Sequence, residues 1–122
     1  MNLINTSTNI YNFLKETLWV DVWAEDSVPI NAKFPYVTYG LTNEAFTTEG
    51  LIQVRIYSES RSIEEVATLS DQLGAVIGEG GTLLRNGMGY IWVYKGSPFA
   101  QLEPTQEDNL KTVYINLLYR NV

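Results

Sequence analysis

Apolar and polar residues alternate most clearly between Leu51 and Tyr57. Ile52, Val54 and Ile56 occupy every second position there, and polar residues stand between them. Because side chains of a β-strand point alternately to its two faces, this spacing predicts a strand with one apolar and one mixed face. We expect it to be half-buried.

The segment after this strand predicts the main helix of the core. Ser62-Ile63-Glu64-Glu65 fits a capping box, in which Ser62 accepts from the amide of Glu65 and Glu65 reaches back. Apolar residues then recur three and four positions apart as far as Ile77, and Gly78 is the expected end of the helix. We expect this helix to cover one face of a sheet.

The N-terminal segment also has apolar residues at helical spacing, and the polar residues 5 to 9 before them can cap a helix. We predict a helix from residue 4 or 8 to Leu18. Its apolar residues are Ile10, Phe13, Leu14 and Leu18. The next residues, Trp19 to Trp23, fit either a short extended segment or the frayed end of this helix, and the pattern does not decide between them. We interpret the two tryptophans as buried under the sheet.

Three further segments have strand patterns, namely Tyr36 to Leu41, Tyr90 to Lys95 and Leu110 to Tyr119. The turn signal Asn86-Gly87 adds a hairpin between Thr82 and Met88. The element order is therefore α-β-β-α-β-β, and neighbouring strands without a helix between them favour antiparallel pairing. We predict a single α+β domain over residues 1–122, an antiparallel or mixed β-sheet with two helices packed on one face.

Two polar stretches, Thr42 to Gly50 and Gly96 to Asn109, are predicted to be long loops. They carry a few large apolar side chains, Phe46 in the first and Phe99 and Leu102 in the second. An isolated subunit gains little from exposing these side chains, so they are candidate subunit-interface residues. The alternative is that they hold their loops against the domain.

The absence of Cys and His removes the commonest nucleophiles, general bases and soft metal ligands. Gly78 to Thr82 and Gly87 to Gly89 contain glycines without the strand-to-helix setting of a phosphate or dinucleotide loop, so we interpret both as turns. We expect no cofactor and no metal. Only a carboxylate-based enzyme is left as an alternative, and it requires at least two of these acids to converge: Asp21, Glu25, Glu103, Glu107 and Asp108.

Charge and hydropathy bear on the partners. The net charge is -6 and the eight Lys and Arg are scattered, which argues against specific nucleic-acid binding. No apolar run approaches the length of a membrane span, and no basic leader precedes Lys15, so we expect a protein made in the cytoplasm that begins near Met1. Eight tyrosines and three tryptophans weakly favour a binding or assembly protein.

The order of these segments resembles a known family. Phe34-Pro35-Tyr36-Val37 before a strand, the strand Ile52 to Tyr57, the Ser-Ile-Glu-Glu helix start and the closing strand from Thr112 are similar to the tail terminator, or tail completion, proteins of long-tailed bacteriophages. The resemblance extends over nearly the whole chain in order and length. It rests on element order, because these minor tail proteins have no catalytic motif to match.

The resemblance implies a structural phage or prophage protein without enzymatic activity. In that family, small α+β subunits form a ring, commonly a hexamer, that caps the tail tube and later meets the head connector. The implied partners are further copies of the chain, the tail tube protein and the head connector protein. The implied location is the head–tail junction of the virion, after assembly in the host bacterial cytoplasm. A head–tail connector or another minor tail protein fits the sequence as well.

Overall fold

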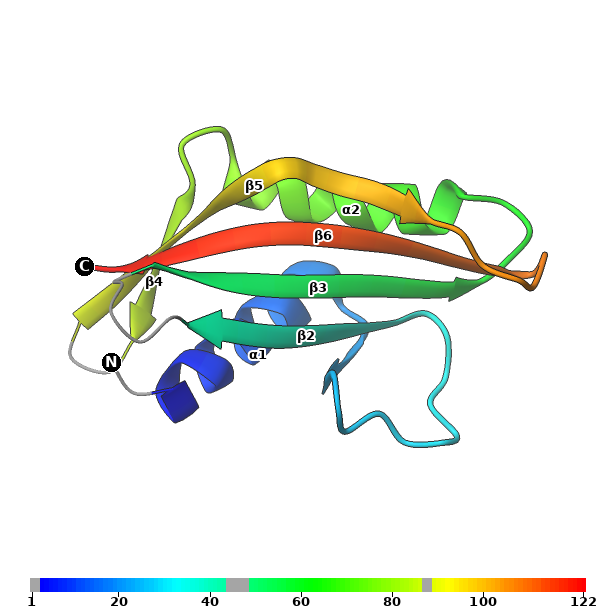
Figure 1. Cartoon of the computed structure of the whole chain (residues 1–122), viewed down its shortest axis with the longest axis horizontal. Helices are drawn as coiled ribbons and strands as arrows, with labels where there is room; N and C mark the ends of the chain where they lie inside the picture. The colour runs from blue at the N-terminus through cyan, green and yellow to red at the C-terminus, as the bar shows by residue number, and fades with distance from the viewer. Residues whose placement is uncertain (1–2, 44–48, 87–88) are drawn as a thin grey trace.

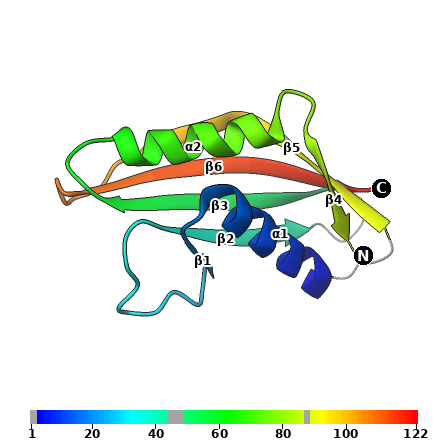
Figure 2. The same ribbon diagram turned by 180° about the vertical axis from the view of Figure 1, so that it is seen from behind.

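The chain forms one six-stranded β-sheet with both helices on the same face (Figures 1 and 2). The computed structural model describes residues 3–43, 49–86 and 89–122. In chain order the elements are α1 Leu3–Leu18, β1 Asp21–Ala24, β2 Tyr36–Asn43, β3 Glu49–Glu59, α2 Glu64–Ile77, β4 Thr82–Asn86, β5 Gly89–Glu103 and β6 Leu110–Asn121. The predicted α+β class is confirmed, with one additional strand, β1, ahead of the first predicted one.

The sheet is mixed, and its strand order is β1-β2-β3-β6-β5-β4. β1 runs parallel to β2, whereas every other neighbouring pair is antiparallel. β3 and β6 lie at the centre, and β3 pairs with β6 along its whole length, from Glu49 opposite Arg120 to Glu59 opposite Leu110. The C-terminal strand is therefore held between two others.

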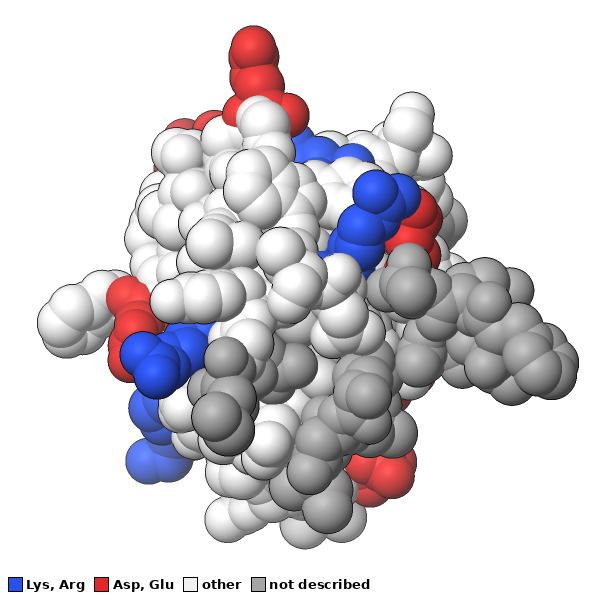
Figure 3. Space-filling view, turned by 90° about the vertical axis from the view of Figure 1, so that its left-hand side faces the viewer, with Lys and Arg blue, Asp and Glu red and all other residues white. Residues whose placement is uncertain are grey.

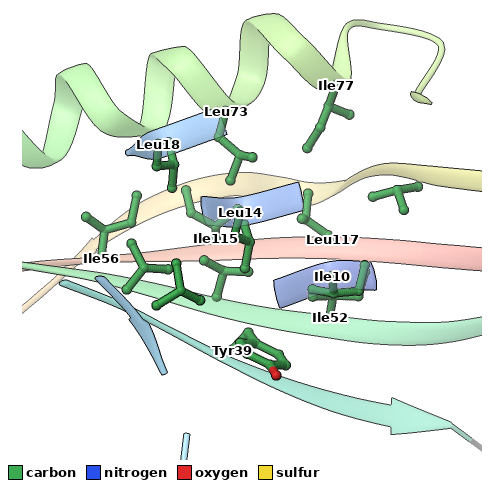
Figure 4. Packing of buried hydrophobic residues seen from close by; sticks show 14 of the residues in the cluster. Ile10, Leu14, Leu18, Tyr39, Ile52, Ile56, Leu73, Ile77, Ile115 and Leu117 are labelled. Atoms are coloured by element: carbon green, nitrogen blue, oxygen red, sulfur yellow. The ribbon is translucent and has the colours of Figure 1, made fainter. Parts of the chain in front are cut away.

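The hydrophobic core lies between this sheet and the two helices (Figure 4). The apolar positions of β3, predicted from their period of two, are fully buried and stand in register with apolar positions of β6. α1 and α2 contribute residues at helical spacing to the other side of the core. The labelled members are Ile10, Leu14, Leu18, Tyr39, Ile52, Ile56, Leu73, Ile77, Ile115 and Leu117. Burial of this single apolar layer accounts for helices on one face only.

The predicted capping box of α2 is wrong, although the helix itself is confirmed. Ile63 occupies the N-cap position without a side-chain hydrogen bond, and Ser62 Oγ accepts from the N–H of Glu64 at 3.1 Å. The Glu65 carboxylate instead accepts from the hydroxyl of Ser58, which is fully buried at the end of β3. A buried hydroxyl needs a hydrogen-bond partner, and Ser58 finds it in the Glu65 carboxylate. Glu65 is therefore not used for the predicted capping box. α2 ends at Gly78 with φ +71°, as predicted.

The stretch from Trp19 to Trp23 contains a strand, because β1 begins at Asp21. Trp19 turns the chain out of α1 with φ +59°, and its N–H still donates to the carbonyl of Lys15 at 3.0 Å. Its side chain is 86% exposed, so the interpretation of Trp19 as buried is wrong. Trp23 is partly buried, and its indole Nε1 is buried without an acceptor among the residues described.

The predicted loops are shorter than expected. β2 continues to Asn43 and β3 begins at Glu49, while Phe46 lies outside the described residues. The second stretch is mostly strand, because β5 continues to Glu103 with a register shift between Lys95 and Ala100. Pro98 is tolerated inside that irregular segment, where β4 no longer pairs with β5. The predicted hairpin is confirmed by the pairing of Asn86 with Gly89; residues 87 and 88 lie outside the described residues.

Candidate interaction surface

The sheet has a second face that neither helix covers, and it is turned toward the viewer in Figure 1. Since side chains alternate along a strand, the positions between the buried ones point to this open face. In β3 and β6 these include Arg55, Tyr57, Tyr114 and Leu118. The alternation was evident in the sequence, but the strand order was needed to bring these residues together.

Arg55 is the centre of a polar cluster on the open face. Its Nε donates to Glu103 Oε1 at 2.9 Å, and its guanidinium carbon lies 4.8 Å from the ring centroid of Tyr114. The hydrogen bond that Arg55 donates to Glu103 raises the pKa of Arg55, and the nearby charge of Glu25 acts in the same direction. Two strands far apart in the sequence are thus joined by a partly buried, charge-assisted contact.

Beside this cluster lies a group of three neighbouring aromatic rings. Tyr36 and Tyr57 stack with centroids 4.8 Å apart, and Phe34 lies 5.2 Å from Tyr36. Partial burial, and then the neighbouring Tyr57, raises the pKa of Tyr36. The rings keep one end of the open face apolar but leave phenol groups for hydrogen bonding.

The opposite end of the open face is apolar with a charged margin. Leu51 and Trp92 are exposed there, and Glu49 accepts hydrogen bonds from Arg120 and from the Tyr94 hydroxyl, the latter at 3.2 Å. The hydrogen bond from Arg120 is the main reason that the pKa of Glu49 is lowered. In Figure 3, which views this end of the molecule, much of the described surface is white, with basic and acidic groups toward its margins.

The candidate subunit-interface residues occupy different environments. Phe99 is partly buried against the core, where its ring faces Gly74 of α2 and the Lys95 ammonium lies 5.0 Å from its centroid. Leu102 is 52% exposed near the end of β5. Phe46 lies outside the described residues. Leu102 therefore has the accessibility that an interface residue needs, and Phe99 also anchors β5 to the core.

The five acids of the enzyme alternative are spread over the sheet and its margins. Glu103 is paired with Arg55, and the Glu25 carboxylate lies over Gly40 at the β2 edge. Asp21 is exposed in β1, while Glu107 and Asp108 are exposed in the connection before β6. No group of three or more acidic residues suited to a metal ion occurs in the described parts of the chain.

A depression of about 420 Å³ lies at the edge of β2, beyond the end of β1. Its lining residues come from α1, β1, β2 and the turn after β1: Ser7, Ala24, Glu25, Asp26, Tyr39, Gly40 and Leu41. Ser7 Oγ and the Tyr39 hydroxyl are hydrogen-bonded at 3.0 Å. The sequence offered no signal for this depression, because the depression forms only where the short strand β1 leaves the longer strand β2 uncovered.

Among the residues described, no helix is long and apolar enough to cross a membrane. The sequence matches no family model and no curated protein. One similar solved structure is a chain of the virion of a native gene transfer agent particle, with a TM-score of 0.56, 12% identity, and coverage of 88% of this chain and 83% of that one. A second similar solved structure, of no stated function, has a TM-score of 0.60 and 16% identity, and the match covers 98% of this chain and 92% of that one. These similarities establish the fold.

Proposed function

We propose that this protein is a structural subunit of a phage or phage-like particle. The observation that carries the proposal is the similarity of nearly the whole fold to a chain of a gene transfer agent virion. The resemblance of the sequence to tail terminators is a separate source of support. Within this class we propose the tail terminator, which forms a ring, in the family commonly a hexamer, on the tail tube and joins it to the head connector.

The surface of the chain is suited to such a role. Aromatic, apolar and charged groups share the open face of the sheet, a mixture common in protein interfaces. The net charge of -6 would let DNA pass through a ring without adhering to it. The proposed partners are other copies of the chain, the tube protein and the connector protein. The proposed role is non-enzymatic and is performed at the head–tail junction.

Deletion of the gene from the genome that encodes it tests the proposal. A ring that caps the tube stops tube growth, so its loss should give tubes of abnormal and variable length without attached heads. Electron microscopy of the lysate measures tube length, and expression of the chain from a plasmid should restore it. Tubes of normal length that lack heads would indicate a connector instead. Particles of normal structure would contradict a structural role and would favour an enzyme.

A further inference from the structure

The two outer edges of the sheet are stepped in opposite directions. β1 pairs with Tyr36–Tyr39 alone, so Gly40–Asn43 of β2 has a strand neighbour, β3, on one side only. At the other edge β4 pairs with Gly89–Val93 of β5, and no described strand lies outside Tyr94–Glu103. Each edge therefore has a projecting part and a recessed part with unpaired backbone, which is open to another chain.

The strand register sets the projecting part of each edge level with the recessed part of the other. Ala100 lies opposite Ile115, Ile115 opposite Val54, Val54 opposite Tyr39, and Tyr39 opposite Ala24 of β1. The uncovered end of β5 is thus level with β1, whereas β4 begins level with the last residue of β2. A second copy placed beside the first, without a shift along the strands, would have edges that interlock with it.

A bulge lies in the recessed part of the β5 edge. Four residues of β5, Gly96 to Phe99, stand opposite the single residue of β6 between Ile115 and Leu117. This insertion, the β5 bulge, bends the strand near its middle (Figure 1). Ser97 and Pro98 are exposed in it. The bulge is therefore accessible to a partner.

The depression at the β2 edge lies at the level of the β5 bulge. Tyr39 and Leu41 line it on either side of Gly40. Through β3, these two residues are in register with the two β6 residues that flank the bulge. In the interlocked arrangement the bulge of one copy would therefore stand against the depression of the next.

Charge favours this contact. Glu25 and Asp26 line the depression, and Lys95 directly precedes the bulge. The described residues contain no salt bridge to any of the three. Lys95 lies on the helix side of the sheet, near Gly74 of α2, and is level with Leu41 of the depression. The ammonium and the carboxylates would therefore meet at the same height.

The same arrangement covers Leu102. This residue is 52% exposed and, through the register, is level with Val22 of β1, so a neighbouring copy would bring its β1 edge to this side chain. Asp21 would come level with Glu103, whose charge Arg55 already compensates at 2.9 Å. The step in the edge thus gives cover to an apolar residue that the subunit alone leaves exposed.

We propose that the β5 bulge of one copy seats in the depression at the β2 edge of a second copy and so joins subunits head to tail. The contact uses a different surface on each partner, and repetition of such a contact yields a ring when the rotation closes. The inference deepens the proposed function and rests on it for the closed ring, but the contact can be measured by itself.

Cysteine cross-linking tests the contact, because the natural chain has no Cys. The variant Ser27→Cys with Ser97→Cys places one thiol beside the depression, where the Ser27 hydroxyl donates to Asp26 at 3.2 Å, and one on the β5 bulge. β3 and β6 lie between β2 and β5, which separates the two edges by roughly 14 Å at the usual strand spacing. A disulfide needs Cα atoms within about 7 Å, so any bond must join two copies. Mild oxidation should give a ladder of covalent dimers, trimers and larger species that dithiothreitol abolishes.

Matched controls separate the contact from random collision. Each single cysteine variant should stop at dimers. Ser27→Cys with Gln72→Cys, an exposed position of α2, should give no ladder.

Charge reversal tests the contact a second time in the double-cysteine background. Lys95→Glu should reduce the ladder several-fold, whereas Arg61→Glu, which changes the net charge equally at an exposed site, should not. Asp26→Lys alone should also reduce the ladder, and its combination with Lys95→Glu should recover it. Circular dichroism shows whether each variant is folded, and the exposed Asp26 keeps the test valid if Lys95→Glu is not.

The outcomes distinguish the two proposals. A ladder together with normal particles in the deletion strain would support the contact and contradict the phage role. Rings of the natural chain without a ladder would overturn the contact and leave the role intact. A ladder that is equally strong in the Gln72 control, unchanged by charge reversal, or absent at the highest attainable concentration overturns the contact. Double-cysteine chains that stop at dimers, or that are captured only by a different protein, also overturn it.

Discussion

At the scale of single residues, Trp19 is the clearest departure from what the fold alone requires. Its backbone is left-handed, a conformation that costs an L-residue about 1–2 kcal/mol, and its side chain is 86% exposed. Glycine is the usual residue at such a helix end. A strained position that keeps a large exposed aromatic side chain favours a role in contact with a partner.

We predict that Trp19→Gly raises the free energy of unfolding by roughly 0.5–1 kcal/mol, because it removes the strain and loses little burial. Urea unfolding followed by tryptophan fluorescence measures the change, since two tryptophans remain. Trp19→Ala is the matched control, because it also removes the indole but keeps Cβ. Equal stability of the two variants would contradict the strain explanation.

Tyr119 gives the fold a sensitivity to alkaline pH. Burial raises its pKa above 10.0, so the folded chain keeps this proton at pH values where the unfolded chain loses it. The stabilisation is complete below the unfolded pKa and is lost as pH rises through the folded one. We predict that Tyr119→Phe loses less stability than the natural chain between about pH 8 and about pH 11.

Urea unfolding at the two pH values measures this slope. Tyr90→Phe is the control, because Tyr90 is 45% exposed, and it should keep the slope of the natural chain. If Tyr119→Phe were as alkali-sensitive as the natural chain, Tyr119 would not be the source.

The sequence predicted the buried residues of single elements better than the polar contacts between elements. Ile52, Val54 and Ile56 are buried because a local period of two is enough to specify one face. The contact of Glu65 with Ser58 could not be foreseen, because it depends on how α2 packs against the end of β3. The contact of Arg55 with Glu103 depends likewise on strand order.

At the scale of elements, short and irregular strands were the ones that sequence could not assign. β1 has only four residues, too few for a period to be distinguished from the end of a helix. β5 continues past Gly96 and Pro98, residues that normally end a strand, because the register shifts there and pairing with β6 resumes at Ala100. Tertiary pairing overrides the local signal in both segments.

Two of the candidate interface residues, Leu102 and Phe99, lie in β5, and substitutions at these positions test their roles. We predict that Leu102→Ser changes the free energy of unfolding by less than about 0.5 kcal/mol but weakens ring or particle assembly, because Leu102 is exposed. Phe99→Ser should lower stability by about 2–3 kcal/mol, since its ring packs against the core. Thermal unfolding and particle yield measure the two effects. A Leu102→Ser variant with normal assembly would remove Leu102 from the interface.

At the scale of the whole molecule, one face of the sheet builds the core and the other face and the edges remain for partners. Hydrophobic patterning predicts the first face, because it repeats within each strand. The open face and the uncovered edge at Gly40–Asn43 follow from strand order and from the shortness of β1, and neither property is encoded locally. This is why the fold class was predictable from the sequence, whereas the open face and the uncovered edge were not.

The most direct test of the structural role is the position of the chain in purified particles. Particles from the strain that encodes the protein can be imaged by cryo-electron microscopy, with an epitope tag on the chain as the marker. We predict density for a ring of this fold at the head–tail junction, present in every complete particle and labelled by an antibody to the tag. Complete particles that lack the chain would contradict the account.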